Sequence, residues 1–434
     1  MEVRTIHSFL SSWIKNSGSQ IDPDLLQTLQ KRSHFLKYIP ASIRSPVEKI
    51  WHHFSQIPVL IHWENPKIQL ELPSIKKKIA VKQYFDQIHT ISSPVSIFDL
   101  QEIIKLKGVK KVYLDRKVRA CLHIAAPTIQ APPIWETDNQ GEGATIAILD
   151  TGIAPHADLE SRIVAFVDFI NGRPKPYDDN GHGTHCAGCA ASSGKSSNGL
   201  YRGIAPKAKL VGVKVLGKYG ESNLSQVIQG IEWCIKNKDK YNIRIISLSL
   251  GSSTQLSHLD DPLCLITEMA WKNGIVVVAA AGNEGPYPQT ISSPGNHPTI
   301  ITVGATDDRR TPYPHDDQVA IFSSRGPTRD GYTKPDILAP GTNIISLRSK
   351  NSFLDTWLVQ NRVNDHYFRL SGTSMSTPIV SGVVALMLTK KPSLTPNEVK
   401  QYLLQSAQTL HQPENIQGKG LVNAKKALNL ITNA

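Results

Sequence analysis

The sequence predicts an α/β protein: a doubly wound, mostly parallel sheet with helices on both faces, preceded by a small α+β domain. From residue 144 onward, short apolar segments alternate with stretches of helical periodicity, which is typical of a parallel sheet covered on both faces. Residues 57–120 instead contain three strand-like segments and one amphipathic helix, the pattern of a small α+β unit. The chain has 434 residues, which is enough for one large and one smaller domain.

The strands of the large sheet are expected where Val, Ile and Ala form short continuous runs. Two segments between them place apolar residues three and four positions apart and are expected to be helices. Near the C-terminus, Thr395 and Glu398 form a capping box with Pro396 at the first helical position, so a helix begins there. The expected strands cover 144–150, 208–216, 244–250, 274–282 and 299–305, and the two helices cover 224–237 and 262–273.

The N-terminal part of the chain divides into three segments. Residues 1–56 form an extension to which the sequence assigns no role. Residues 57–120 form the small α+β unit, and residues 121–133, with three prolines and no charged side chain, are expected to link it to the large domain over 134–434. Within the small unit, strands are expected at 57–63, 77–83 and 110–120, and a helix at 96–107.

The N-terminal 20 residues do not have the pattern of a signal peptide, because Glu2, Arg4 and Lys15 interrupt the apolar run that such a peptide needs. The longest uncharged run, 370–389, is long enough to span a bilayer, but its many hydroxyl side chains fit a buried central helix better. We therefore expect a cytoplasmic protein with no membrane partner.

The cysteine content agrees with that compartment. Five cysteines are an odd number, and without an export signal they favour free thiols in a reducing environment. Cys186 and Cys189 form a C-x-x-C pair, but no second cysteine pair completes a zinc site. We expect both to be small buried packing residues.

The net charge of +12 is concentrated at the N-terminus, where residues 1–120 hold 19 Lys and Arg against 10 Asp and Glu. A nucleic-acid site would need a basic face interleaved with aromatic residues, or a known motif. Neither surrounds the lysines at 76–78 or at 110–111, so these charges are expected to lie on solvated surface and no nucleic-acid partner is expected.

Four segments carry residues with catalytic chemistry. Asp150 ends a predicted strand in ILDTG, and Asn283 follows another in AAAGNEG. His182 begins a helical stretch in NGHGTHCAG, and Ser374 does so in SGTSMSTP. Active sites of open parallel sheets form where strands give way to loops and helix N-termini, so these four residues are expected to lie together.

Together the four residues can support acyl transfer. A serine hydroxyl becomes a good nucleophile when an imidazole takes its proton, and a buried carboxylate fixes the tautomer of that imidazole. Ser374, His182 and Asp150 can take these roles. The Asn283 side chain and the backbone N–H of Ser374 can stabilise an oxyanion, and Gly372 would let the backbone turn tightly beside the nucleophile.

With these four motifs in the order Asp, His, Asn, Ser, the sequence resembles the subtilisin family of serine peptidases. The resemblance covers about residues 130–430 and includes FSSRGPT at 322–328 and KPDILAPG at 334–341. It implies a subtilisin-like fold and a serine endopeptidase that works through an acyl-enzyme intermediate on polypeptide substrates. Without an export signal, the chain looks closest to the intracellular AprX-type branch. His185 looks like the family's second, structural histidine.

The resemblance also implies a substrate cleft in which a peptide adds as an extended strand between two edges. Glu221 and Glu284 would favour basic substrate residues if they face this cleft, although solvated surface is an equal alternative for both. The pocket for the residue before the cleaved bond would lie between two walls of small residues. The edges are Gly220, Glu221 and Ser222 and Ser249, Leu250 and Gly251, and the second pocket wall is Ala280, Ala281 and Gly282.

Residues 57–120 look similar to the family's propeptide, a ferredoxin-like folding chaperone and intramolecular inhibitor. Autocleavage is then expected between Ala120 and Pro127. The family's chemistry requires no cofactor, but calcium commonly stabilises its members. Asp158 falls near a calcium-ligating position of the family, yet the adjoining loop at 192–203 differs in length from the usual ligand loop, so a metal site is left open.

Two other classes of function compete with the peptidase. A protein that kept the fold only to bind peptides would not need the hydroxyl of Ser374. A nucleic-acid binder acting through residues 1–120 would show steeply salt-dependent binding.

Overall fold

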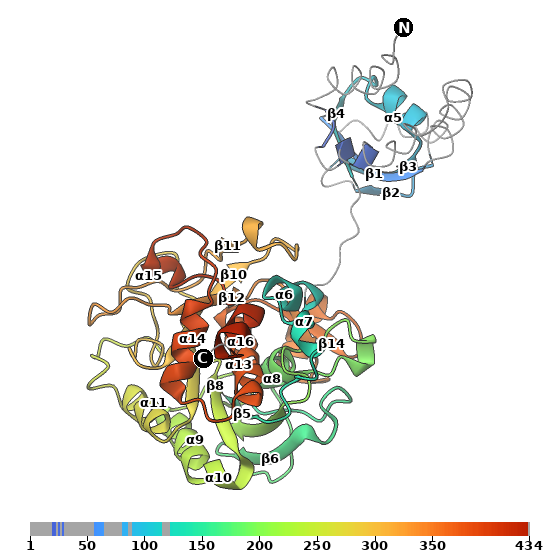
Figure 1. The fold of residues 1–434 in the computed structure, drawn as a ribbon. Helices are drawn as coiled ribbons and strands as arrows, with labels where there is room; N and C mark the ends of the chain where they lie inside the picture. Colours follow the sequence, from blue (N-terminus) through green and yellow to red (C-terminus); the bar gives the residue numbers. More distant parts are fainter. Residues whose placement is uncertain are drawn as a thin grey trace. The chain divides into compact units, whose positions relative to one another are not determined.

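The structure is a computed structural model that describes residues 20–22, 25–26, 28–29, 56–64, 80–85, 89–114 and 122–432. The chain divides into two compact units, Met1–Val118 and Arg119–Ala434 (Figure 1).

The N-terminal unit contains a four-stranded antiparallel sheet in the order β2-β3-β1-β4. Alternate residues of the central strand β1 are buried, because one face of the sheet packs on the core of this unit. The helix α5 begins at a capping box in which Ser96 and Asp99 bond each other's backbone amides. The elements are β1 (Ile57–Trp63), β2 (Gln83–Phe85), β3 (Thr90–Val95), α5 (Ile97–Ile103) and β4 (Val109–Leu114).

Two expectations for this unit need correction. The strand expected at 77–83 is absent from Ala80–Lys82 and occurs at Gln83–Phe85, whereas 77–79 lie outside the described residues. The strand β3 was not expected, because its sequence TISSPV contains two serines and a proline, which have low strand propensity. The last expected strand ends at Leu114 among the described residues. A ferredoxin-like topology stays a prediction.

The segment 121–133 is not the linker that its prolines suggested. Residues Leu122–Thr128 form helix α6 and Pro132–Trp135 form helix α7. Ala125 and Ile129 are fully buried in the core of the larger unit. Because the segment has no charged side chain, it can be buried, and Pro132 stands at the start of α7, where a helix needs no amide donor.

The larger unit is built on an eight-stranded sheet in the order β11-β10-β9-β8-β5-β7-β6, with β12 also paired to β10. All pairs are parallel except β10 with β11, which confirms the mostly parallel sheet. The strands are β5 (Thr145–Asp150), β6 (Ile163–Asp168), β7 (Lys209–Lys214), β8 (Ile243–Leu248), β9 (Val276–Ala280), β10 (Ile301–Asp307), β11 (Gln318–Val319) and β12 (Ile337–Pro340), with β13 (Ile344–Leu347) and β14 (Tyr367–Leu370) in a separate hairpin sheet.

Helices cover both faces of this sheet, since every residue of β5 and of β9 is buried without alternation. Helices α8 and α13 pack against each other, as do α9 and α11, which lie side by side in Figure 1. The central helix α13 is buried along almost its whole length. The helices are α8 (His182–Ala191), α9 (Leu224–Lys236), α10 (Lys238–Tyr241), α11 (Pro262–Lys272), α12 (Phe353–Trp357), α13 (Thr373–Lys390), α14 (Pro396–Gln405), α15 (Glu414–Gln417) and α16 (Ala424–Thr432).

Candidate active site

The fold brings the four expected catalytic segments to the carboxyl end of the sheet. Asp150 is the last residue of β5, His182 the first of α8 and Ser374 the second of α13. Asn283 lies in the loop that follows β9. Each side chain is therefore positioned by the end of a strand or by the first turn of a helix, as expected from the sequence.

Helix α8 can approach β5 closely because its second residue is a glycine. A Cβ atom at Gly183 would lie 2.2 Å from the Gly152 carbonyl oxygen and 3.0 Å from the Cβ of Asp150. Any larger residue would push the start of α8 away from the strand. The glycine in the HGTH motif thus sets the distance between His182 and Asp150.

Asp150 and His182 form a direct hydrogen bond. His182 Nδ1 donates to Asp150 Oδ1 over 2.8 Å, and the Thr151 amide donates to the same oxygen over 2.7 Å. Asp150 is fully buried, whereas the imidazole of His182 keeps 22% of its surface exposed. An ionised carboxylate can only accept hydrogen bonds, so the proton of the neutral imidazole is on Nδ1. Nε2 is therefore free to accept a proton from a hydroxyl group.

The charge of Asp150 controls the protonation of His182. Burial of the imidazole would by itself lower the pKa of His182, but the adjacent Asp150 carboxylate, together with Cys186, outweighs burial and raises that pKa well above its ordinary value. A histidine of raised pKa is a strong base. The pair is therefore suited to take a proton from a hydroxyl.

Ser374 is half-buried at the start of α13 and is linked to Ser249 in both directions. Ser374 Oγ donates to the Ser249 carbonyl over 3.1 Å, and Ser249 Oγ donates to the Ser374 carbonyl over 2.8 Å. Within the described residues, Ser374 makes no hydrogen bond to His182. Such bonds are often made only when substrate is present, and rotation about one side-chain bond redirects the hydroxyl.

Asn283 is held by Thr373, the residue before Ser374. Its Oδ1 accepts from the backbone amide and the hydroxyl of Thr373, at 2.9 and 3.1 Å, which leaves Nδ2 as the free donor end of the side chain. A Cβ atom at Gly372 would lie 3.5 Å from Nδ2 and 3.7 Å from the Ser374 amide nitrogen. Glycine at this position, with φ of 154°, thus leaves space between two donors that converge on it, as an oxyanion requires.

The comparisons with known proteins agree with this geometry. Residues 141–420 match the model of the Subtilase family. The chain belongs to the subtilase family.

Several curated subtilases are similar to the chain. Serine protease AprX from Bacillus subtilis (strain 168) is 43% identical over 96% of this chain and 97% of that protein. Thermostable alkaline protease from Halalkalibacterium halodurans is 38% identical over 74% of this chain and 80% of that protein. Subtilisin Savinase from Lederbergia lenta is 36% identical over 69% of this chain and 96% of that protein. The resemblance to the subtilisin family and to AprX is thereby confirmed, and this subtilase is a serine peptidase that acts on polypeptides.

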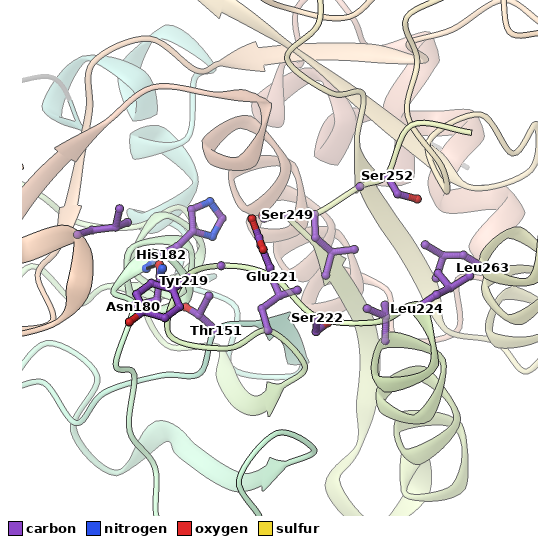
Figure 2. A pocket seen from close by; sticks show the side chains of 16 residues that line it. Thr151, Asn180, His182, Tyr219, Glu221, Ser222, Leu224, Ser249, Ser252 and Leu263 are labelled. Atoms are coloured by element: carbon purple, nitrogen blue, oxygen red, sulfur yellow. Dashed lines mark hydrogen bonds between the residues drawn. The ribbon is translucent and has the colours of Figure 1, made fainter. Parts of the chain in front are cut away.

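The cleft of this subtilase is a cavity of about 630 Å³ beside His182. Both expected peptide-binding edges line it: Gly220, Glu221 and Ser222 on one side and Ser249, Leu250 and Gly251 on the other. Figure 2 shows Glu221 between His182 and the side chains of Leu224 and Leu263, which lie toward the other end of the cavity. The cavity is additionally lined by residues that the sequence did not single out, among them Asn180, Tyr219, Leu224, Val227 and Leu263.

The second pocket wall, Ala280, Ala281 and Gly282, does not line this cavity. Ser292 occupies the space between the two walls instead, since a Cβ atom at Gly251 would lie 3.0 Å from Ser292 Cβ and one at Gly282 would lie 2.5 Å from its hydroxyl. Nothing in the sequence around Ser292 indicated this position. The side chain of Glu284 turns toward neighbouring donors, accepting from the Asn283 amide over 2.9 Å and from Ser324 Oγ over 3.2 Å.

Helix α8 also carries His185 and Cys186, about one turn after His182. His185 is buried, and its Nε2 donates to the carbonyls of Ile344 and Phe368 at 3.2 and 3.1 Å; burial lowers its pKa to about 3. It is thus a neutral structural histidine, as the resemblance implied. Cys186 Sγ lies 3.8 Å from His182 Nδ1 and 3.4 Å from the Ser374 carbonyl oxygen. The four cysteines in the described residues, 186, 189, 234 and 264, are all buried and free, as expected.

Asp158 is buried in a network of protein donors. Its Oδ1 accepts from the Ser196 amide over 2.8 Å, and its Oδ2 accepts from Ser192 Oγ over 3.0 Å and from the Tyr367 hydroxyl over 2.5 Å. Burial would raise the pKa of Asp158, but these bonds hold it below its ordinary value. Both oxygens therefore already accept hydrogen bonds from the protein, which compensates for burial without a metal ion, and a calcium role for Asp158 stays a prediction.

No helix in the described part of the chain combines the length and the apolar character needed to span a membrane.

Proposed function

We propose that the chain is an endopeptidase in which Ser374 is the nucleophile, His182 the general base and then acid, and Asp150 the residue that orients and stabilises the imidazolium. The observation that carries this proposal is the 2.8 Å bond from His182 Nδ1 to the buried Asp150, at a peptide-sized cleft that is also lined by Ser249, whose carbonyl accepts from the Ser374 hydroxyl. His182 Nε2 takes the proton of the Ser374 hydroxyl as Oγ forms a bond to the substrate carbonyl carbon.

The negative charge that develops on the carbonyl oxygen is stabilised by Asn283 Nδ2 and the Ser374 amide, the two donors that converge beside Gly372. His182 then gives its proton to the leaving amine as the peptide C–N bond breaks, which leaves an acyl-enzyme ester on Ser374. A water molecule hydrolyses this ester by the same two proton transfers in reverse. Every group that takes part in these reaction steps belongs to the protein, to the substrate or to water.

Two features of the cleft predict its substrate preference. Leu224, Val227, Leu250 and Leu263 make one part of the cavity apolar, so we propose that it accepts a large apolar side chain of the substrate. Glu221 also lines the cavity and would favour a basic side chain at a neighbouring position.

We further propose that residues 57–120 act as an intramolecular inhibitor that is removed by autocleavage. The described strands and helix α5 give this region a compact unit of its own, as such a role requires. A scissile bond must be extended to pair with the edges of the cleft. Since Leu122–Thr128 is helical and largely buried from Ile124 onward, we place the cleavage before Leu122, at the N-terminal end of the expected 120–127 interval.

The test compares wild type, Ser374→Ala and the control Ser225→Ala, which removes an exposed hydroxyl from α9. Intact mass is followed over time together with hydrolysis of casein and of a chromogenic peptide. We expect wild type and Ser225→Ala to lose about the first 120 residues and to cleave both substrates. Ser374→Ala should stay full-length and lose roughly 10⁶-fold in kcat, the size of loss known for subtilisin itself.

If Ser374→Ala cleaves as fast as wild type, the proposed nucleophile is wrong. If both proteins bind peptide and neither cleaves it, the chain is a peptide-binding relative of the peptidases. If wild type cleaves substrate while remaining full-length, the triad stands and the inhibitory role of residues 57–120 fails.

A further inference from the structure

Four buried oxygen atoms without hydrogen-bond partners lie where β10 and β11 meet. They are Asp308 Oδ2, both carboxylate oxygens of Asp317 and Thr306 Oγ1. The exposed fraction of the residue is 1% for Asp308, 7% for Asp317 and 0% for Thr306. A buried oxygen that accepts no hydrogen bond is costly, by about 1–3 kcal/mol and more when charged, so each requires a partner.

The strand register places these oxygens on the same face of the sheet. In the antiparallel pair, Thr306 is opposite Val319 and Asp307 is opposite Gln318, and continuing this register by one residue past the strand ends would place Asp308 opposite Asp317. Opposed residues have Cβ atoms about 4.5–5.5 Å apart, and residues two apart on a strand share a face. The two aspartates therefore face each other, with the Thr306 hydroxyl beside them. Two like charges in this arrangement repel each other.

The surroundings do not neutralise the two carboxylates. The pKa of Asp308 and that of Asp317 are each raised to about 7, mainly by burial and in part by the charges of neighbouring aspartates, Asp307 for the first and Asp308 for the second. The Arg310 amide donates to the other oxygen of Asp308 over 3.0 Å. Arg325 lines the same cavity as Asp317, yet neither oxygen of Asp317 accepts a hydrogen bond from it.

A cavity of about 420 Å³ opens beside Asp317. It is lined by Asp317, Gln318 and Val319 of the strand, together with residues of the C-terminal segment around Gln412 and with Arg325. The space is sufficient for a cation that keeps several water ligands. The unpartnered atoms of Asp308, Asp317 and Thr306 are oxygens, which hard divalent cations prefer as ligands, while Arg325 Nε at the wall of the same cavity also has no partner.

We propose that Asp308, Asp317 and Thr306 bind a calcium ion, with waters in the adjoining cavity completing its coordination. Calcium takes six to eight oxygen ligands in flexible geometry, and two carboxylates with one hydroxyl and waters satisfy this need. Magnesium demands a near-ideal octahedron and fits an irregular loop less well. The ion gives each unpartnered oxygen a ligand bond and removes the repulsion between the two aspartates. This site is separate from Asp158 and from the catalytic residues.

A bound ion would also stabilise the start of the larger unit. The loop between β10 and β11 holds Thr311, whose hydroxyl donates to both oxygens of Asp316 and whose carbonyl accepts from Thr128 Oγ1 over 3.3 Å. Thr128 is the last residue of α6, close to the proposed cleavage site. Calcium at the loop would therefore strengthen the attachment of the segment that becomes the N-terminus after processing.

The experiment measures thermal unfolding of the full chain carrying Ser374→Ala, which prevents autolysis. Protein stripped with EDTA and dialysed is titrated with CaCl₂ up to about 10 mM, well above the weakest dissociation constants of protein calcium sites. Isothermal titration calorimetry gives the stoichiometry, and a parallel titration uses MgCl₂. The variants are Asp317→Asn and Asp308→Asn, and the control is Asp365→Asn, whose side chain is 80% exposed.

We expect calcium to raise the Tm of the parent and of Asp365→Asn with one binding event, and magnesium to raise it less. Asp317→Asn and Asp308→Asn should lose this rise by at least tenfold in apparent affinity while remaining folded, because Asn has nearly the shape of Asp and removes a buried charge. In EDTA their Tm should be at or above that of the parent. If calcium leaves the Tm of the parent unchanged, or shifts all four proteins equally, the carboxylates are neutralised by a proton or by Arg325 and the proposal is wrong.

Discussion

Two buried aspartates of the larger unit, Asp158 and Asp317, differ in the number of hydrogen bonds that they accept from the protein. Asp158, fully buried, accepts hydrogen bonds from three protein donors, and its pKa is held below the ordinary value. Asp317, 7% exposed, accepts none, and burial raises its pKa to about 7. The first region has its donors built into the sequence at Ser192, Ser196 and Tyr367.

The difference shows that burial of an acid does not by itself indicate a metal site. What distinguishes the two regions is whether the protein supplies the groups that compensate for lost hydration. The resemblance to a family suggested calcium near Asp158, whose oxygens have protein donors, whereas the carboxylate oxygens of Asp317 and one of Asp308 have none. Asp150 is intermediate, because Oδ1 has two donors and Oδ2 has none.

The largest effect is expected at this intermediate acid. Asp150→Asn keeps the size of the side chain but removes the charge that orients and stabilises protonated His182. We expect kcat/KM to fall by about 10⁴-fold, the size known for the corresponding change in other serine peptidases. Since activity needs neutral His182 and its pKa is raised, the activity of wild type should decline as pH falls through a value above 6.5, and Asp150→Asn should move this decline to lower pH.

The control is Asp260→Asn, which changes an exposed aspartate and should leave the pH profile of kcat/KM unchanged. Circular dichroism of each variant reports whether it is folded. An Asp150→Asn variant that is folded and retains more than a tenth of wild-type activity would show that Asp150 is a structural acid like Asp158.

The next effect tests Asp158 as a structural acid. Asp158→Ala leaves Ser192 Oγ, the Ser196 amide and the Tyr367 hydroxyl without their acceptor. We expect a loss of about 3–5 kcal/mol in the free energy of unfolding. The measurement is urea denaturation in EDTA on the Ser374→Ala background. In the same buffer Asp317→Asn should not lower the free energy of unfolding. Equal losses of this free energy at both sites would show that the two aspartates do not differ in their hydrogen bonding.

The structural features that the sequence predicted correctly are those that depend on local sequence patterns. The parallel sheet was predictable because β5, β7, β8, β9 and β10 are continuous apolar runs, and the helix start at the capping box of Thr395 and Glu398 was correctly located. The positions of the four candidate residues were predictable because each belongs to a local motif at a strand or helix end. The expectation that they lie together followed from the topology of parallel sheets.

Features that depend on long-range packing were not predictable. The segment 121–133 looks like a linker by composition, but packing on the core of the larger unit makes Leu122–Thr128 and Pro132–Trp135 helical and buries residues such as Ala125 and Ile129. Ser292 fills the space between Gly251 and Gly282 through contacts between segments distant in sequence. The pairing of Asp308 with Asp317 required the register of β10 and β11, which two residues of β11 could not indicate beforehand.

The smallest loss of stability is expected when one of the three donors to Asp158, the Tyr367 hydroxyl, is removed alone. Tyr367→Phe removes only the hydroxyl that donates to Asp158 over 2.5 Å and should cost about 1.5–3 kcal/mol, the range for a hydrogen bond to a charged group. The folded-state pKa of Asp158 is lowered, so its stabilising contribution is complete above the unfolded pKa of about 3.9 and is lost as pH falls through the lower folded value. The cost of Tyr367→Phe should therefore shrink in that acidic window. In a double-mutant cycle it should also largely vanish on the Asp158→Ala background, and an unchanged cost there would mean that Tyr367 acts through packing or through its 3.0 Å bond to Ser197.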